Sequence, residues 1–218
     1  LNGVINDKEV VDLENTWLTV GKIREAISIF APNKAAGPDN IKPAILQHLP
    51  DNFLHQLGYL YRASLALEYV PEPWRLSRAI FIPKVGKKDY AEARAWRPIS
   101  LMSFLFKTFE RLVLWHLEET VLTTKGLHAE QHAFRKGRST ETALSDTVDY
   151  LESEVLRGGI AVGVFLDIEG AFDNLLPEGV LDSLEQRGTS RELLNWFTRY
   201  LHTRKVTVNY KEVLTKRR

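Results

Sequence analysis

The 218-residue sequence has no cysteine, a single methionine and no run of 18 apolar residues. Without cysteine there is no disulfide framework, no thiol nucleophile and no cysteine-ligated zinc site. Without a long apolar run, no segment is expected to span a membrane. The apolar share of 44% and the charged share of 26% are ordinary for a soluble globular protein. The chain is long enough for one large domain or two modest ones.

The two ends of the chain give little sign of a complete protein. The sequence begins with Leu1 rather than methionine, and no signal peptide precedes it. Residues 1–16 are mixed and acidic, and we interpret them as a linker or the end of an upstream segment. We expect both ends to be cuts in a longer, intracellular chain, located in the nucleus or the cytoplasm.

The net charge of +1 hides three blocks of charge. Residues 75–111 contain nine Lys or Arg against three Asp or Glu, and residues 199–218 contain seven against one. Between them, residues 141–192 contain twelve Asp or Glu against three Arg. Solvated helix faces explain single charges, but this pattern better fits a protein that holds polyanions and also concentrates cations.

Apolar periodicity predicts an α+β protein, rich in helices, with short antiparallel strands. Thr19 and Ser190 are the expected N-caps of two helices, and Pro177 fits the first turn of a third. A breaker at Gly37-Pro38 separates the first two helices. The predicted helices cover about 19–30, 53–70, 103–121, 139–156, 177–187 and 191–201, and the predicted strands 78–84, 158–168 and 205–213.

The predicted strand 158–168 carries an acid, Asp167, at its end, followed six residues later by Asp173. A carboxylate fixed at the rim of a sheet is suited to a hard divalent cation such as magnesium. The simpler interpretation is a strand-end turn and a helix cap. A third possibility is the nucleophile strand of haloacid-dehalogenase-type phosphatases, but those enzymes have a second Asp two residues on, where this chain has Glu169.

Two other patterns have structural interpretations. His128 and His132 are four residues apart, which on a helix would suit zinc, but no third ligand is evident nearby. We therefore do not predict zinc there. The tryptophans are interpreted as core residues rather than as platforms for nucleobases. They include Trp74, Trp96, Trp115 and Trp196.

Four stretches together resemble one family, in that family's order. They are "NKAAGPDNIKPAIL", "AIFIPKVGKKDYAEARAWRPISLMSFLFKTFERLV", "QHAFRKGRSTETAL" and "GVFLDIEGAFDN". Each is similar to a motif of the reverse transcriptases of jockey-like non-long-terminal-repeat retrotransposons, and the resemblance covers roughly residues 17–218. It implies a right-hand polymerase, with fingers at 17–124 and a partial palm at 125–218.

The resemblance also implies roles for individual residues. Lys84 and Arg97 match the residues that grip the incoming triphosphate, and Phe172 the one that excludes a 2′-hydroxyl. Asp167 matches a metal ligand for Mg²⁺ or Mn²⁺, with the backbone carbonyl of Ile168 beside it. Asp173 is a less certain ligand, because a capping or supporting role fits it equally well.

The resemblance implies RNA template, DNA primer and deoxynucleoside triphosphates as partners, and no membrane. The basic loop offers Arg135, Lys136 and Arg138 to a nucleic-acid backbone, although a solvated loop explains them about as well. Two-metal chemistry needs more carboxylate than Asp167 supplies, and no Asp-Asp pair occurs in the sequence. We therefore expect a polymerase portion that is inactive without the remaining palm and thumb, or alternatively a non-catalytic nucleic-acid-binding remnant.

Overall fold

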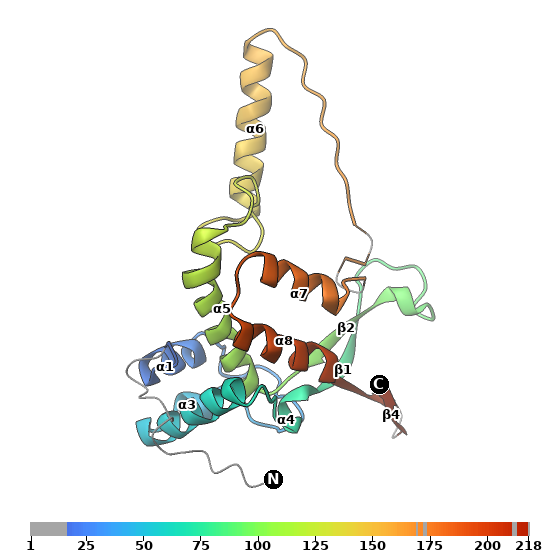
Figure 1. Ribbon diagram of the computed structural model, residues 1–218. Coiled ribbons are helices and arrows are strands. Elements are labelled where there is room, and N and C mark those ends of the chain that lie inside the picture. The colour runs from blue at the N-terminus through green and yellow to red at the C-terminus, as the bar shows by residue number, and fades with distance from the viewer. Residues whose placement is uncertain (1–16, 169, 172–173, 211–212, 218) are drawn as a thin grey trace.

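A computed structural model describes residues 17–168, 170–171, 174–210 and 213–217. A bundle of helices lies beside a four-stranded sheet, and one helix projects away from both (Figure 1). The helices are α1 (Val20–Ser28), α2 (Pro43–Gln47), α3 (Asp51–Ala66), α4 (Glu72–Arg75), α5 (Phe104–Thr124), α6 (Thr140–Leu156), α7 (Pro177–Gln186) and α8 (Arg191–Thr203), with a 3₁₀ turn at Ala93–Ala95. The strands are β1 (Leu76–Pro83), β2 (Trp96–Leu101), β3 (Lys205–Tyr210) and β4 (Val213–Arg217).

Aromatic rings from α3, α5 and α8 form the centre of the core. Tyr61 stacks on Phe109 with ring centroids 4.5 Å apart, and Phe109 meets Trp196 edge-on at 5.1 Å. Trp196 is 1% exposed, and its indole N–H donates to the Ser64 hydroxyl at 3.0 Å. Because buried aromatic rings remove large areas from water, this cluster joins the C-terminal helix α8 firmly to the first half of the chain.

Helix α5 passes through the middle of this core. Phe106 and Phe109 are fully buried on it, and the buried Thr108 hydroxyl donates to the Phe104 carbonyl at 2.8 Å. Despite its 21 residues, α5 is not apolar enough to span a bilayer, and the same holds for the other helices within the described ranges.

The helix starts follow the expected capping chemistry. The hydroxyls of Thr19, Ser139 and Ser190 each accept a hydrogen bond from the backbone N–H three residues later, at 3.2, 3.2 and 3.4 Å. These bonds satisfy donors that a helix leaves unpaired at its first turn. Pro177 is the first residue of α7, and Gly188, with φ of 87°, follows its end. The predicted positions of these helices are confirmed.

Helix α3 ends earlier than its sequence suggests. Pro71 and Pro73 were expected to stop it, but its last residue is Ala66. The chain turns there because Glu68 adopts a left-handed φ of 48°, and the Tyr69 N–H donates to the Ser64 carbonyl at 2.9 Å. The prolines instead begin the short helix α4.

The sheet is mixed, in the order β2-β1-β3-β4. Strands β1 and β2 form an antiparallel hairpin, and β3 pairs antiparallel with β4. The prediction of antiparallel strands is wrong for β1 and β3, which run parallel from the pair Leu76 and Lys205 onward. A parallel pair needs a long crossover, which the chain between β1 and β3 supplies. The β1–β3 contact is reinforced where the Thr207 hydroxyl donates to the Ser77 carbonyl at 3.2 Å.

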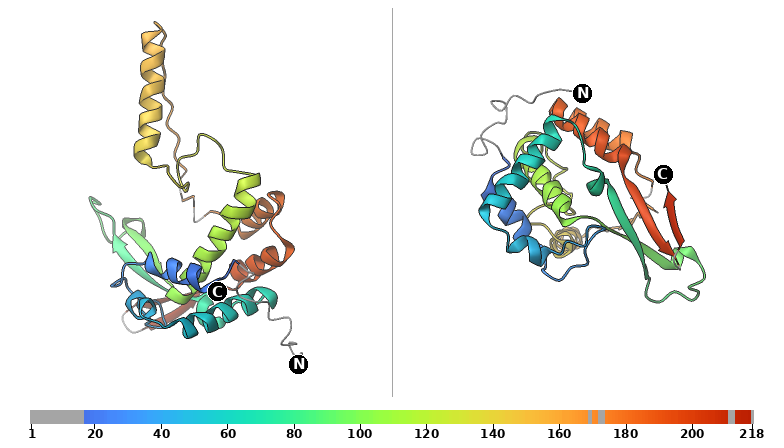
Figure 2. Two further views of the ribbon diagram at one scale, coloured as in Figure 1. Left: turned by 90° about the vertical axis from the view of Figure 1, so that its left-hand side faces the viewer. Right: turned by 90° about the horizontal axis from the view of Figure 1, so that it is seen from below.

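Helix α6 and the chain that returns from it lie apart from the core (Figures 1 and 2). No residue of α6 is buried. The prediction of a strand at 158–168 is wrong for this structure: the segment is extended but has no ladder partner among the described residues. Its side chains stand in solvent, with Ile160, Phe165 and Leu166 each more than 90% exposed. Backbone pairing and a covered face are what make an apolar run a strand, and both are missing here.

Candidate nucleotide and nucleic-acid interface

The hairpin of β1 and β2 places Lys84 and Arg97 on one face. Arg97 pairs with Ile82 across the ladder, and the Lys84 N–H donates to the Ala95 carbonyl at 2.7 Å just beyond it. Side chains alternate along strands, so Ile82, Lys84 and Arg97 share a face. Diagonal neighbours of this kind lie about 7–8 Å apart, within reach of one triphosphate.

Two aromatic residues fix the tip of the hairpin. The Trp96 indole N–H donates to the Tyr90 carbonyl at 2.9 Å, and the Tyr90 hydroxyl donates to the Lys84 carbonyl at 2.9 Å. Their rings meet edge-on with centroids 6.0 Å apart. The sequence prediction placed Trp96 in the core, but it lies half-buried in the hairpin, where it holds the backbone of Tyr90. The position of Trp96 directly after a loop rich in lysine and arginine is the sequence feature that could have indicated this role.

The root of the hairpin is held by the loop at 36–40. Arg78 of β1 donates to the Ala36 carbonyl at 3.3 Å, and Gly37 lies directly against the backbone of Met102. Asn40 closes the loop in a left-handed conformation with φ of 58°. This loop therefore supports the strands that carry Lys84 and Arg97.

Asp167 lies where the prediction did not expect it. It was expected at the rim of a sheet, but it is exposed on the extended segment and makes no hydrogen bond or ion pair with the rest of the described chain. The adjacent Ile168 is 76% exposed. The strand that should fix the carboxylate is not formed, so the structure does not join Asp167 to the hairpin in one site.

The described residues do not by themselves make a metal site. No group of three His, Asp or Glu side chains able to hold a metal occurs among them. Asp167 and the Ile168 carbonyl could supply two oxygen ligands, whereas Mg²⁺ takes about six, several of them waters. Phe172 and Asp173, predicted to flank the nucleotide, lie outside the described residues.

The basic loop between α5 and α6 brings its cations together but uses two of them internally. Arg135 donates to backbone carbonyls of the same loop, and Arg138 contacts the ring of His132 at 3.1 Å. Lys136 is exposed. The sequence analysis named these three cations but missed Phe134, which lies directly before them and is 82% exposed. An aromatic residue followed by Arg-Lys is the signal that could have identified it.

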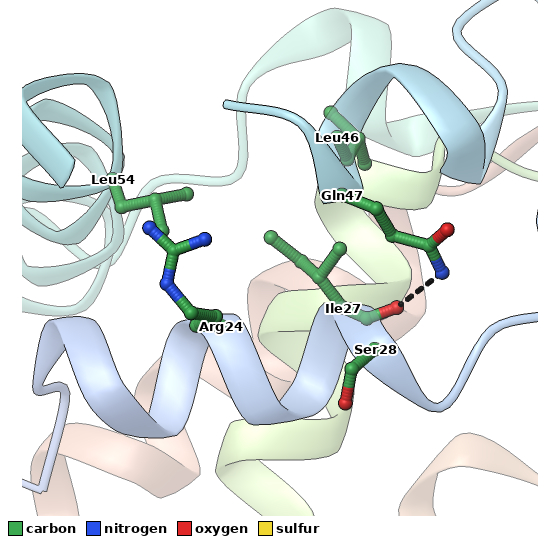
Figure 3. A pocket seen from close by; sticks show the side chains of 6 residues that line it. All are labelled: Arg24, Ile27, Ser28, Leu46, Gln47 and Leu54. Atoms are coloured by element: carbon green, nitrogen blue, oxygen red, sulfur yellow. Dashed lines mark hydrogen bonds between the residues drawn. The ribbon is translucent and has the colours of Figure 1, made fainter. Parts of the chain in front are cut away.

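The pockets of the molecule lie elsewhere. One is enclosed between α1, α2 and the start of α3, with Gln47 donating to the Ile27 carbonyl at 3.4 Å along its edge (Figure 3). Its volume of about 60 Å³ is far below the ~300–1,000 Å³ of small-molecule sites. A second, open hollow is lined by residues 151–156 of α6. Neither includes Lys84, Arg97 or Asp167.

A buried acid lies between α5 and α8. The hydroxyl of Tyr200 donates to the Glu110 carboxylate, and the Arg204 guanidinium lies over the Tyr200 ring at 5.1 Å. Burial raises the pKa of Glu110, although Tyr200, Arg204 and Lys107 each act to lower it. Burial likewise raises the pKa of Tyr200. This cluster sets how α8 meets α5 ahead of β3, so we assign it to the scaffold.

Comparison with known proteins identifies a family for most of the chain. Residues 82–217, which run from the end of β1 to the end of β4, match the reverse transcriptase (RNA-dependent DNA polymerase) family. The probable RNA-directed DNA polymerase from transposon BS of Drosophila melanogaster is 29% identical over 169 residues, 78% of this chain. The RNA-directed DNA polymerase from mobile element jockey, also of Drosophila melanogaster, is 31% identical over 164 residues, 75% of this chain.

The similarity extends to a further type of element. The Pol polyprotein from type-1 retrotransposable element R1 of Bradysia coprophila is 25% identical over 189 residues, 87% of this chain. The chain spans 18% of the length of each of these three relatives.

The family match covers well over half of the chain. The chain belongs to the reverse transcriptase family. This membership favours the polymerase interpretation of Asp167 over the phosphatase interpretation.

Proposed function

We propose that this chain is the fingers and first palm portion of an RNA-directed DNA polymerase. The fingers comprise residues 17–124 and the partial palm residues 125–218, and residues 1–16 are a linker or the end of an upstream segment. The complete enzyme adds deoxynucleotides to a primer on an RNA template, inside the cell. The family match at 82–217, which includes Lys84 and Arg97 on one face of the hairpin, carries the proposal.

The chemistry of the hairpin fits a triphosphate. Arg97 offers a planar fork of donors for two phosphate oxygens, and Lys84 offers a point charge beside it. Phosphoryl transfer depends mostly on positioning and charge neutralisation. A pair of cations on a hairpin that Tyr90 and Trp96 hold in place meets both needs. In the proposal, the Phe172 ring fills the volume that a ribose 2′-hydroxyl would need.

The divalent metal belongs to the longer chain. Asp167 and the Ile168 carbonyl would contribute ligands for Mg²⁺ or Mn²⁺, which supplies charge neutralisation at the transferred phosphate. One exposed carboxylate does not complete such a site, so the 218 residues alone are expected to be inactive. The missing ligands would come from the remaining palm, and the thumb would hold the primer and template.

Triphosphate binding tests the role of the hairpin. We expect the chain to bind a fluorescent deoxynucleoside triphosphate, and Lys84→Ala and Arg97→Ala each to weaken binding by about 10- to 150-fold, since hydrogen bonds to charged groups contribute about 1.5–3 kcal/mol. Lys88→Ala is the matched control, because it removes an exposed cation from the loop of the same hairpin. An equal loss in all three variants would show non-specific attraction and contradict the proposed grip.

Primer extension tests whether the portion is complete. We expect no magnesium-dependent DNA synthesis by the 218-residue chain on a primed RNA template. A longer chain that includes the following palm and thumb should synthesise DNA, and Asp167→Asn should abolish this. Robust synthesis by the 218 residues alone would contradict the proposal that ligands are missing.

A non-catalytic nucleic-acid-binding role is the second candidate. The exposed and unpartnered Asp167 favours it, because no described carboxylate joins it in a metal site. RNA affinity measured at several salt concentrations shows whether the basic residues bind RNA phosphates, as both candidate functions require, or only contact water. Phosphate contacts give a log–log slope of about −0.7 per contact on single strands. Binding with a steep slope, combined with an inactive longer chain, would establish the non-catalytic role.

A further inference from the structure

Phe134 occupies a position that folding alone does not explain. Its backbone lies in the left-handed region, with φ of 59°, where a bulky side chain is strained. Its ring is 82% exposed, so the ring gains little from burial in this chain. Glycine would suit the backbone better, and a polar residue would suit the surface better. Strain combined with an exposed ring indicates a functional position.

The backbone before Phe134 is held rigidly. One nitrogen of Arg135, Nη1, donates to the carbonyls of His128 at 2.9 Å and Ala129 at 3.0 Å. The same nitrogen approaches the Gln131 carbonyl at 3.4 Å. The guanidinium therefore ties together the turn that leads into the strained residue.

The loop on both sides of Phe134 is tied to α6, through His132 before it and Arg138 after it. The ring of His132 contacts the Thr142 hydroxyl at 2.9 Å through Nδ1 and the Asp146 carboxylate at 3.2 Å through Nε2. Arg138 reaches the same imidazole at 3.1 Å, and the hydroxyls of Ser139 and Thr142 complete a capping box. With both sides anchored, the Phe134 ring is presented by a fixed loop.

The chain segment that carries the ring is rich in cations. Between Glu130 and Glu141 the sequence contains Arg135, Lys136 and Arg138 but no carboxylate. Lys136, next but one to the ring, is exposed. An exposed aromatic ring two positions before an exposed lysine complements a nucleobase attached to its phosphate.

We propose that the Phe134 ring stacks on an unpaired base of single-stranded RNA while Lys136 contacts the adjacent phosphate. This inference rests on the proposed function, in which the RNA is the template. Every base has a π-face, so the contact is independent of sequence, as copying any template requires. Because the loop is already fixed, little conformational freedom is lost on binding.

The test uses the 218-residue chain and a short single-stranded RNA that contains 2-aminopurine. Stacking on an aromatic ring quenches the fluorescence of this base. If Phe134 had only a structural role, its ring would not quench the fluorescence. Phe134→Ala is expected to weaken binding by about 5- to 150-fold and to remove the quenching, from the range known for base–aromatic stacking. Phe134→Trp should preserve both. Phe53→Ala is the matched control, since Phe53 is 46% exposed on α3, away from the basic loop.

Two further variants separate stacking from packing. Phe134→Leu keeps an apolar side chain without a π-face, and should lose binding as the alanine variant does. Phe134→Gly removes the ring and relieves the backbone, so its melting temperature should equal or exceed that of the wild type while RNA binding falls. A lower melting temperature, or a leucine variant that binds normally, would overturn the inference in favour of a packing role.

The failure of this inference can be told apart from failure of the proposed function. If the wild-type chain binds the RNA and Phe134→Ala binds equally well, only the stacking role falls. If the wild-type chain binds no single-stranded RNA at low salt, both the template role and the stacking role fall.

Discussion

Gly37 and Met102 approach each other more closely than any side chain at position 37 would allow. A β-carbon on Gly37 would lie 2.4 Å from the carbonyl carbon of Met102 and 2.6 Å from the amide nitrogen of Ser103. Met102 and Ser103 connect β2, which carries Arg97, to α5 of the core. The loop at 36–40 therefore contacts the base of the hairpin at Gly37, where only glycine fits.

Gly37→Ala is expected to destabilise the fold by about 3 kcal/mol, at the upper end of the usual effect of overpacking, because backbone atoms must move. Urea unfolding measures this. Gly179→Ala is the matched control: nothing lies within 4 Å of its added β-carbon in α7, and alanine favours a helix by up to ~1 kcal/mol. A Gly37→Ala protein as stable as the wild type would show that the loop is not pressed against Met102.

Ser64→Ala tests the joint between α3 and α8. The Ser64 hydroxyl accepts from Trp196 at 3.0 Å and donates to the Tyr69 carbonyl at 2.6 Å. Alanine leaves the buried indole N–H unpaired, which costs about 1–3 kcal/mol in free energy of unfolding. Ser153→Ala, which removes a similar hydroxyl from exposed α6, should change stability by less than ~0.5 kcal/mol. Equal losses of stability in the two variants would argue against a buried hydrogen bond between α3 and α8 at Ser64.

The raised pKa of Glu110 predicts a pH-dependent stability. An acid whose folded-state pKa exceeds its unfolded value of 4.5 binds its proton more tightly when folded. Its contribution to stability is therefore present below pH 4.5 and is lost as the pH rises through the folded-state pKa. Glu110→Gln, which cannot ionise, should remove this part of the pH dependence and gain stability over the wild type as the pH rises above 4.5.

The measurement for Glu110 is urea unfolding of both proteins at several pH values between 4 and 8. Glu119→Gln serves as the control, since Glu119 lies on the same helix with an exposed side chain paired to Lys22. Its stability should follow the pH dependence of the wild type above pH 4.5. A Glu110→Gln profile parallel to that of the wild type over this range would contradict the assigned burial effect.

The extended segment at 159–168 should be the first point of proteolysis among the described residues. Phe165 is 92% exposed, and no ladder hydrogen bonds protect its backbone, whereas Phe106 is fully buried. Brief chymotrypsin treatment followed by mass spectrometry should find cleavage at Phe165 before any at Phe106. In a longer chain that includes the remaining palm, cleavage at Phe165 should slow markedly. The reason for this expectation is that the remaining palm would supply the strand neighbour that the segment lacks, and unchanged cleavage there would contradict it.

The local structure followed well from the sequence. Thr19 and Ser190 were predicted as N-caps and are confirmed, because capping depends on one side chain and the next few backbone groups. The hairpin strand before Lys84 and the buried positions of Trp74 and Trp196 were also predicted correctly. The family followed from four motifs in order, and the match at 82–217 confirms it.

What the sequence misjudged depends on partners that are distant in the chain. The run at 158–168 has the composition of a buried strand, yet a strand needs a neighbour to pair with, and none lies along it among the described residues. The parallel pairing of β1 with β3 was missed because it joins residues about 130 positions apart. Trp96 was placed in the core because its aromatic character does not say which surface it covers.

The sequence by itself determined the six longer helices, the N-caps Thr19 and Ser190, the strand before Lys84 and the polymerase family, since each depends on local chemistry or on an ordered set of short motifs. Only the tertiary structure decided that Lys84 and Arg97 share a face and that Gly37 lies against Met102. It also decided that Phe134 has an exposed ring and a strained, left-handed backbone. It also showed that Asp167 is not yet fixed in place. These features depend on pairing and packing between segments far apart in the chain, which no local pattern encodes.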